Sequence, residues 1–181
     1  MGEVLVVNPA SVGVMGVLGA TKRSARTAIV RHDSWSEDGL LNLARSAGRH
    51  PSAAITLGHG RIGEDLSVVG LLAKPRLLGP IAVRLDRCPG LNEKLRRLVR
   101  DPVLDHAADW VLTLLAAAGG CEIHHTDSFK PHRVSHSPYD ADELRPEGRA
   151  WLVATMVELI GEESLCAHEA RRLWKFWRGG R

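Results

Sequence analysis

Short apolar segments alternate with helical stripes along this 181-residue chain, and this alternation constrains its fold more than any other feature. The apolar segments have the length and composition of buried strands and are bounded by Gly, Pro or Asn. They occur at 4–7, 27–31, 53–57, 68–73, 81–85 and 121–126. Strands that alternate with helices are typical of an α/β domain with a parallel sheet.

The helical stripes carry recognisable start and stop signals. Ser34-x-x-Glu37 fits a capping box before an apolar stripe that Gly48 ends, and Asp101-Pro102 is a favourable helix start. Helices are expected at 34–47, 91–99, 101–118, 146–160 and 162–177. We therefore predict one α/β domain over 1–181, with a mostly parallel central sheet flanked by helices and a helical C-terminal segment from about 146 to 178.

Composition limits the class of protein. With 44% hydrophobic and 25% charged residues, the chain resembles soluble globular proteins. The three cysteines are odd in number, far apart and in no CxxC spacing, so we expect neither a disulfide framework nor a cysteine zinc knuckle, and a reducing compartment. The apolar start lacks the charge order of a secretory signal and is too short to span a membrane. We expect a cytoplasmic protein without a membrane span.

Three candidate strands end in residues capable of chemistry. "RHDS" occupies 31–34, "GHGRIGED" occupies 58–65 and "HHTD" occupies 124–127. In open α/β sheets, ligands gather beyond the carboxyl ends of the strands. This coincidence is the main functional indication in the sequence.

The segment from 120 to 136 contains four histidines. Side chains alternate faces along a strand, so His125 would share a face with Asp127 while His124 would point the other way. His125 with Asp127, or His124 with His132 or His136, could hold a divalent metal. The alternative is a polar surface loop whose histidines have no special role.

The other two strand ends offer further candidate ligands. His59 lies between two glycines, which permit a sharp turn and close approach of a ligand, with Glu64 and Asp65 nearby. The alternative is an ordinary glycine turn with a solvated acidic pair. His32 follows the strand at 27–31, and Glu37 is either an additional ligand or only a helix-capping residue.

These residues support the hypothesis of a metal-dependent hydrolase that acts on an amide or ester in a small-molecule or peptide-like substrate. His59, His125 and Asp127, with His32, would bind one divalent ion, expected to be zinc, that activates water. Glu64 would be the general base, and Arg84 or Arg87 would neutralise substrate charge.

The order of these residues along the chain resembles that of a known class of enzymes. A His after an early strand, an Arg on a middle strand and a second His after a later strand resemble the layout of zinc amidohydrolases of the carboxypeptidase-like and N-formylglutamate amidohydrolase kind. The likeness covers about residues 27–130 and implies a zinc-dependent amidohydrolase. The compact His-x-x-Glu pair of those enzymes is absent from this stretch.

A second hypothesis is a basic, non-enzymatic binding module for nucleic acid or a protein partner. The formal net charge is +3, and "ARRLWKFWRGGR" near the C-terminus surrounds Trp174 and Trp177 with basic residues. Such a helix could grip nucleic acid, or it could dock its aromatic side into the core.

Overall fold

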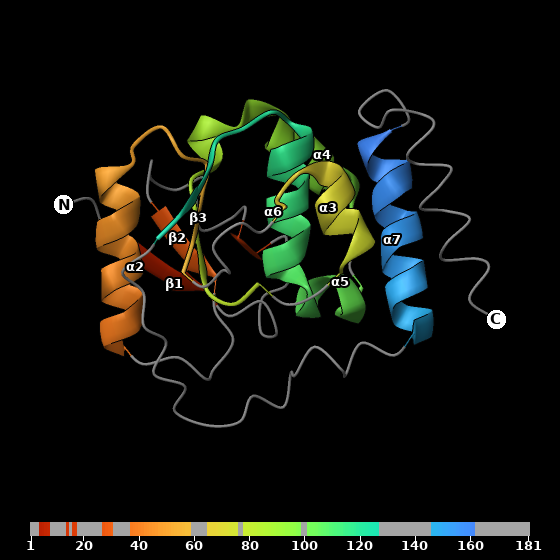
Figure 1. The fold of residues 1–181 in the computed structure, drawn as a ribbon, viewed down its shortest axis with the longest axis horizontal. Coiled ribbons are helices and arrows are strands. Elements are labelled where there is room, and N and C mark those ends of the chain that lie inside the picture. Colours follow the sequence, from red (N-terminus) through yellow and green to blue (C-terminus); the bar gives the residue numbers. More distant parts are fainter. Residues whose placement is uncertain are drawn as a thin grey trace.

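A computed structural model (Figure 1) describes residues 4–7, 14, 16–17, 27–30, 37–58, 65–75, 78–98, 101–126 and 146–161. The strands are β1 (Val4–Val7), β2 (Thr27–Val30), β3 (Ile55–Leu57), β4 (Ile81–Val83) and β5 (Ile123–His125). The helices are α2 (Glu37–Arg49), α3 (Val68–Ala73), the 3-10 turn η1 (Leu85–Arg87), α4 (Pro89–Arg97), α5 (Pro102–His106), α6 (Ala108–Ala118) and α7 (Pro146–Ile160).

The five strands form one sheet in the order β1-β2-β4-β3-β5. The pairs β1–β2 and β3–β5 are parallel, whereas β4 is antiparallel to both of its neighbours. The α/β class predicted from the sequence is therefore confirmed. The sheet is mixed, however, because β4 runs against the other four strands.

The direction of β4 follows from the way the chain returns to the sheet. The chain leaves β3 after Leu57 and enters β4 at Ile81, and these two residues are register partners. Beside them, the Gly58 amide donates to the carbonyl of Pro80 at 2.9 Å. A Cβ on Gly58 would lie only 2.8 Å from that oxygen, so the close approach requires glycine.

Helix α2 covers one face of the sheet, over β2, β3 and β4 (Figure 1). Its buried residues recur at helical spacing and meet Ile29 and Ala82 of the sheet in a small cluster. The helix members of this cluster are Leu40, Leu43, Ala44 and Ala47. Glu37 and Asp38 in the first turn and Arg49 in the last turn complement the helix dipole.

Helix α6 lies on the opposite face, with α3, α4 and α5 around it and α7 outermost (Figure 1). Residues 108–116 of α6 are all buried, which is the pattern of a helix enclosed by other elements. Trp110 is fully buried, and its indole nitrogen donates to the Leu71 carbonyl at 3.0 Å. The main core of the protein therefore lies between α6 and the sheet.

Several local predictions are confirmed, and one apolar run is helical. Asp101 caps α5 by accepting from the Val103 amide at 2.8 Å, and α7 occupies the predicted span. The run at 68–73 is helix α3, because the Ser67 side chain caps it and Leu71 and Leu72 face the core. The helix expected at 162–177 lies outside the described residues.

Although we expected no disulfide framework, the structure contains a disulfide. Cys88 and Cys121 are bonded, with their Cα atoms 5.8 Å apart. They are 33 residues apart in the chain, and the fold brings the start of α4 next to the link between α6 and β5. Sequence spacing alone does not reveal such a pairing.

None of the helices in the described part of the chain has the length and hydropathy that crossing a membrane requires.

Candidate functional site at the strand ends

The carboxyl ends of the parallel-running strands lie in one row across the sheet. Val7 pairs with Val30, Val30 with Ile81, Ile81 with Leu57, and Leu57 with His125. The Thr126 amide extends this ladder by donating to the Leu57 carbonyl at 3.1 Å. We call the set Val7, Val30, Ile81, Leu57 and His125 the strand-end row.

The register also assigns the two histidines of β5 to opposite faces. His125 shares its row with Val30, Leu57 and Ile81, which belong to the main core on the α6 side. His124 is the partner of Thr56, in the row of Ile29 and Ala82 on the α2 side. The predicted separation of His124 from His125 is therefore confirmed.

On the α2 side, His124 contacts His50, a histidine outside the predicted site. The imidazole rings of His50 and His124 stack with centroids 3.5 Å apart and planes 24° from parallel. His50 directly follows α2, and both residues are half-buried. No local motif could have predicted the pair, because the contact depends on the packing of the end of α2 beside β5.

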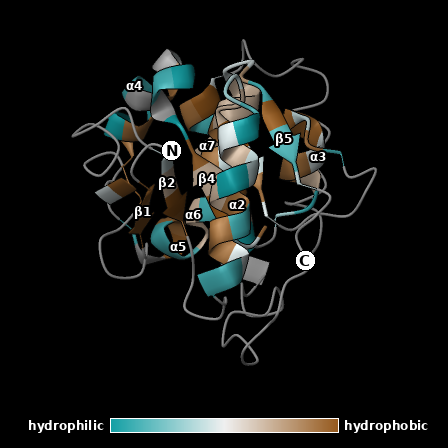
Figure 2. Cartoon of the chain, turned by 90° about the vertical axis from the view of Figure 1, so that its left-hand side faces the viewer, coloured by the Kyte–Doolittle hydropathy of each residue, from teal (hydrophilic) through white to brown (hydrophobic). Residues whose placement is uncertain are grey.

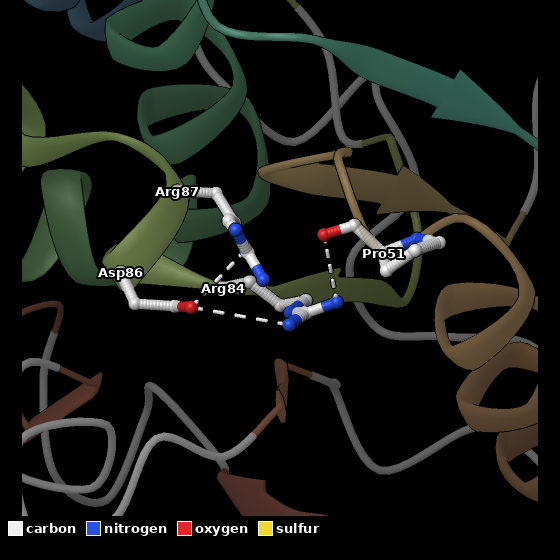
Figure 3. A network of polar contacts seen from close by, with 4 residues as sticks. All are labelled: Pro51, Arg84, Asp86 and Arg87. Atoms are coloured by element: carbon white, nitrogen blue, oxygen red, sulfur yellow. Dashed lines mark hydrogen bonds and ion pairs between the residues drawn. The ribbon is translucent and has the colours of Figure 1, made fainter.

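Arg84 and Arg87 lie at the other end of the sheet, in a polar network with Asp86 and Pro51 (Figure 3). Arg84 donates to the Pro51 carbonyl at 3.0 Å and lies 3.9 Å from the Asp86 carboxylate. The Arg87 Nε atom is 3.2 Å from the same carboxylate oxygen.

This end is distant from His125 because β4 is antiparallel. Arg84 follows Val83, which pairs with the first residue of β3, whereas His125 pairs with the last. The offset from the strand-end row is three residues, or about 10 Å along the strand, and two strand spacings of about 4.8 Å also intervene. The structure therefore does not bring Arg84 and Arg87 together with His125.

The remaining predicted residues lie outside the described part of the chain. They are His32, His59, Glu64, Asp127, His132 and His136. Within the ranges that the structure describes, no three His, Cys, Asp or Glu side chains form a group able to hold a metal ion.

Asp65, considered with Glu64 as a possible ligand, forms a hydrogen bond with Ser67, the N-cap residue of α3. Its carboxylate accepts from the Ser67 amide at 2.9 Å. Hydrogen bonds from the side chain and backbone of Ser67 lower the pKa of Asp65 below its ordinary value. Its hydrogen bonds with the N-cap residue of α3 are thus sufficient to explain this carboxylate.

Asp109 is a fully buried carboxylate behind the strand-end row. Its Oδ2 atom accepts from the amides of Leu78 and Gly79 at 2.6 and 2.8 Å, and Oδ1 accepts from the Trp110 amide at 2.9 Å. Burial raises the pKa of Asp109 to about 6, although these hydrogen bonds act in the opposite direction. Asp109 therefore holds the segment that leads into Ile81.

A groove of about 270 Å³ lies between β1, β2 and α2, along the opposite edge of the sheet from β5. It is lined by Val4, Val6, Ile29, Glu37, Leu40, Leu41 and Ala44. Figure 2 looks onto α2 from outside, with the hydrophobic strands β1 and β2 beside it. Val6 and Leu41 are both 48% exposed, so the groove is an open apolar surface.

Comparison with protein families, curated proteins and solved structures finds no match. The geometry of the strand-end row is thus the basis for the function proposed below.

Proposed function

We propose that the chain is a metal-dependent hydrolase whose site lies beyond the strand-end row. The observation that carries the proposal is the alignment of Val30, Leu57 and His125 in that row. In the sequence, His32, His59 and Asp127 each follow one of these residues by two positions. Three separate segments with potential ligands therefore begin from the same edge of the sheet.

The spacing of the strands is compatible with a shared ion. β3 and β5 are neighbours at about 4.8 Å, and β2 is two strand spacings from β3. Two residues of chain span at most about 7 Å, so the chain length permits side chains from all three segments to reach a common point. Imidazole and carboxylate donors suit zinc, and such an ion would supply water activation and charge stabilisation.

The protein groups would then have separate tasks. His59 and His125, with Asp127 and His32, would hold the ion, and Glu64 would accept a proton from the attacking water. Arg84 and Arg87 could contact only a substrate that extends to the other end of the sheet, since both lie there. We therefore propose an amide or ester substrate of small-molecule or peptide-like size, hydrolysed in the cytoplasm.

Chelation and reloading of the full chain, purified without a histidine tag, test this proposal. We expect hydrolysis of a panel of amides and esters to disappear after chelation and to return with Zn²⁺. His59→Ala and His125→Ala should each lower the rate by about 100-fold or more, because loss of a ligand removes at least as much as loss of its supporting residues. His124→Ala, on the other face of β5, is the matched control.

A different result would favour the binding module. A chain that binds no metal and hydrolyses nothing in the panel, but binds nucleic acid with steep salt dependence, would refute the hydrolase.

A further inference from the structure

The two bonded cysteines lie in very different surroundings. Cys88 belongs to the main core and is 1% exposed, whereas Cys121 is only partly buried. The neighbours of Cys121 on both sides, Gly120 and Glu122, are exposed. An incoming reagent can therefore approach the sulfur of Cys121 and not that of Cys88.

Gly119 leaves a path to this sulfur. A Cβ at Gly119 would lie 3.2 Å from the sulfur of Cys88 and 3.3 Å from that of Cys121, so even a methyl group would press on the disulfide. Gly119 has a φ of −82°, which any residue can adopt. The backbone does not require glycine here, and the missing side chain leaves room beside the sulfur of Cys121.

Attack at Cys121 makes Cys88 the leaving sulfur. Cys88 is the N-cap residue of α4, a helix of nine residues, and its own side chain makes no capping hydrogen bond. The positive end of a helix dipole favours a thiolate, whereas burial in an apolar core disfavours it, and Cys88 is subject to both effects.

In the reduced form, the thiol of Cys121 has a hydrogen-bond acceptor close by. The sulfur of Cys121 lies 3.8 Å from the Gly119 carbonyl, to which a thiol at this position can donate a weak hydrogen bond. The core cluster that contains Cys88 extends from β1 to α7, so we expect the reduced chain to remain folded.

We propose that Cys88 and Cys121 form a reversible thiol–disulfide exchange site that reacts with a dithiol. A thiolate of the dithiol attacks the sulfur of Cys121, and the electron pair of the protein disulfide passes to Cys88, which leaves as a thiolate. The second thiol of the reagent then attacks the mixed disulfide and releases Cys121. The protein disulfide is reduced to two thiols, the reagent is oxidised to a disulfide, and its two protons pass to the cysteines.

This proposal is independent of the hydrolase, because its readout is the state of the cysteines. The native full chain is incubated with dithiothreitol, free thiols are trapped with iodoacetamide, and peptide masses assign each label. We expect Cys88 and Cys121 to be unlabelled after oxidation and labelled within minutes of reduction, and to be protected again when oxidised dithiothreitol is added. Cys166 is monitored separately by its own peptide.

Two single-cysteine variants test which sulfur is attacked. Cys88→Ser should form a mixed disulfide with oxidised glutathione at Cys121, whereas in Cys121→Ser the buried Cys88 should react at least about tenfold more slowly, a difference in barrier of about 1.4 kcal/mol. Equal rates at the two sulfurs would overturn the assignment of Cys121 as the attacked atom.

Gly119→Ala tests the path to the disulfide, and Gly90→Ala is its matched control, because a Cβ at Gly90 meets nothing within 4 Å. We expect slower reduction by dithiothreitol in Gly119→Ala alone. Native protein that is labelled at Cys88 and Cys121 only after denaturation would show a permanent structural disulfide and refute the exchange site. Labelling at both positions even after oxidation would refute it as well.

Discussion

The two faces of the sheet bury very different amounts of apolar surface. On the α6 side, the main core extends from β1 to α7 and includes the fully buried Trp110 and Leu112. On the α2 side, among the residues that the structure describes, α2 covers β2, β3 and β4, and its buried cluster is small. Val6 and Leu41 remain 48% exposed on that side, where α2 does not cover β1.

This difference indicates which side of the sheet contributes most to stability. Because burial of apolar surface is the main favourable contribution to folding, the α6 side should dominate the free energy of unfolding. Residues on the α2 side should tolerate substitution. Strand β5 carries one histidine on each face of the sheet. Matched substitutions on the two sides test this view.

Asp109→Ala should cause the largest loss of stability. It removes the acceptor of three backbone amides in a fully buried site, at a cost of about 4 kcal/mol in the free energy of unfolding. Asp38→Ala, an exposed carboxylate in the first turn of α2, should cost less than about 1 kcal/mol. Urea denaturation measures both, and comparable losses would contradict the proposed asymmetry.

The pH dependence of stability should report the same carboxylate. The pKa of Asp109 is about 6 in the folded chain, above its ordinary value of 3.8, so the folded state binds the proton more tightly than the unfolded state. The contribution of this bound proton to the free energy of unfolding is complete below pH 4. It is lost as the pH rises through 6, which lowers the free energy of unfolding by about 3 kcal/mol.

Asp109→Asn is the control for this pH dependence, since the amide does not titrate. The difference in unfolding free energy between wild type and Asp109→Asn, measured from pH 4 to 8, should change with pH in that direction. A difference that is constant over this range would exclude the raised pKa.

On the α2 side, the stacked pair of His50 and His124 should contribute little to the free energy of unfolding. A double-mutant cycle with His50→Ala and His124→Ala should give a coupling of about 1 kcal/mol, as for other aromatic pairs. A coupling of zero would mean that the stack does not persist in solution. A coupling as large as the effect of Asp109→Ala would remove the contrast between the two sides.

The sequence predicted the features that depend on local chemistry. The Asp101-Pro102 start of α5, the span of α7 and the alternation in β5 all follow from rules that act within a few residues. The stretch at 68–73 was ambiguous because a short apolar run suits either a strand or a buried helix. The capping side chain of Ser67 favours the helix.

The features that depend on contacts distant in sequence could not be predicted. The antiparallel direction of β4 requires the approach of Gly58 to Pro80, and the disulfide requires that α4 begin beside the link before β5. The position of Arg84 and Arg87 at the end of the sheet away from His125 follows from the antiparallel β4 and has no local signal in the sequence. The contact of His50 with His124 likewise arises only from packing of α2 against the sheet.

The metal content of two single variants tests the central claim most directly. The full chain is purified without a tag, equilibrated with one equivalent of Zn²⁺, desalted and analysed by elemental mass spectrometry. We predict about one zinc per chain in the wild type and in His124→Ala, and almost none in His125→Ala, because only His125 lies in the strand-end row on the α6 face. Equal zinc content in the two variants, or no retained zinc in the wild type, would contradict the proposed site.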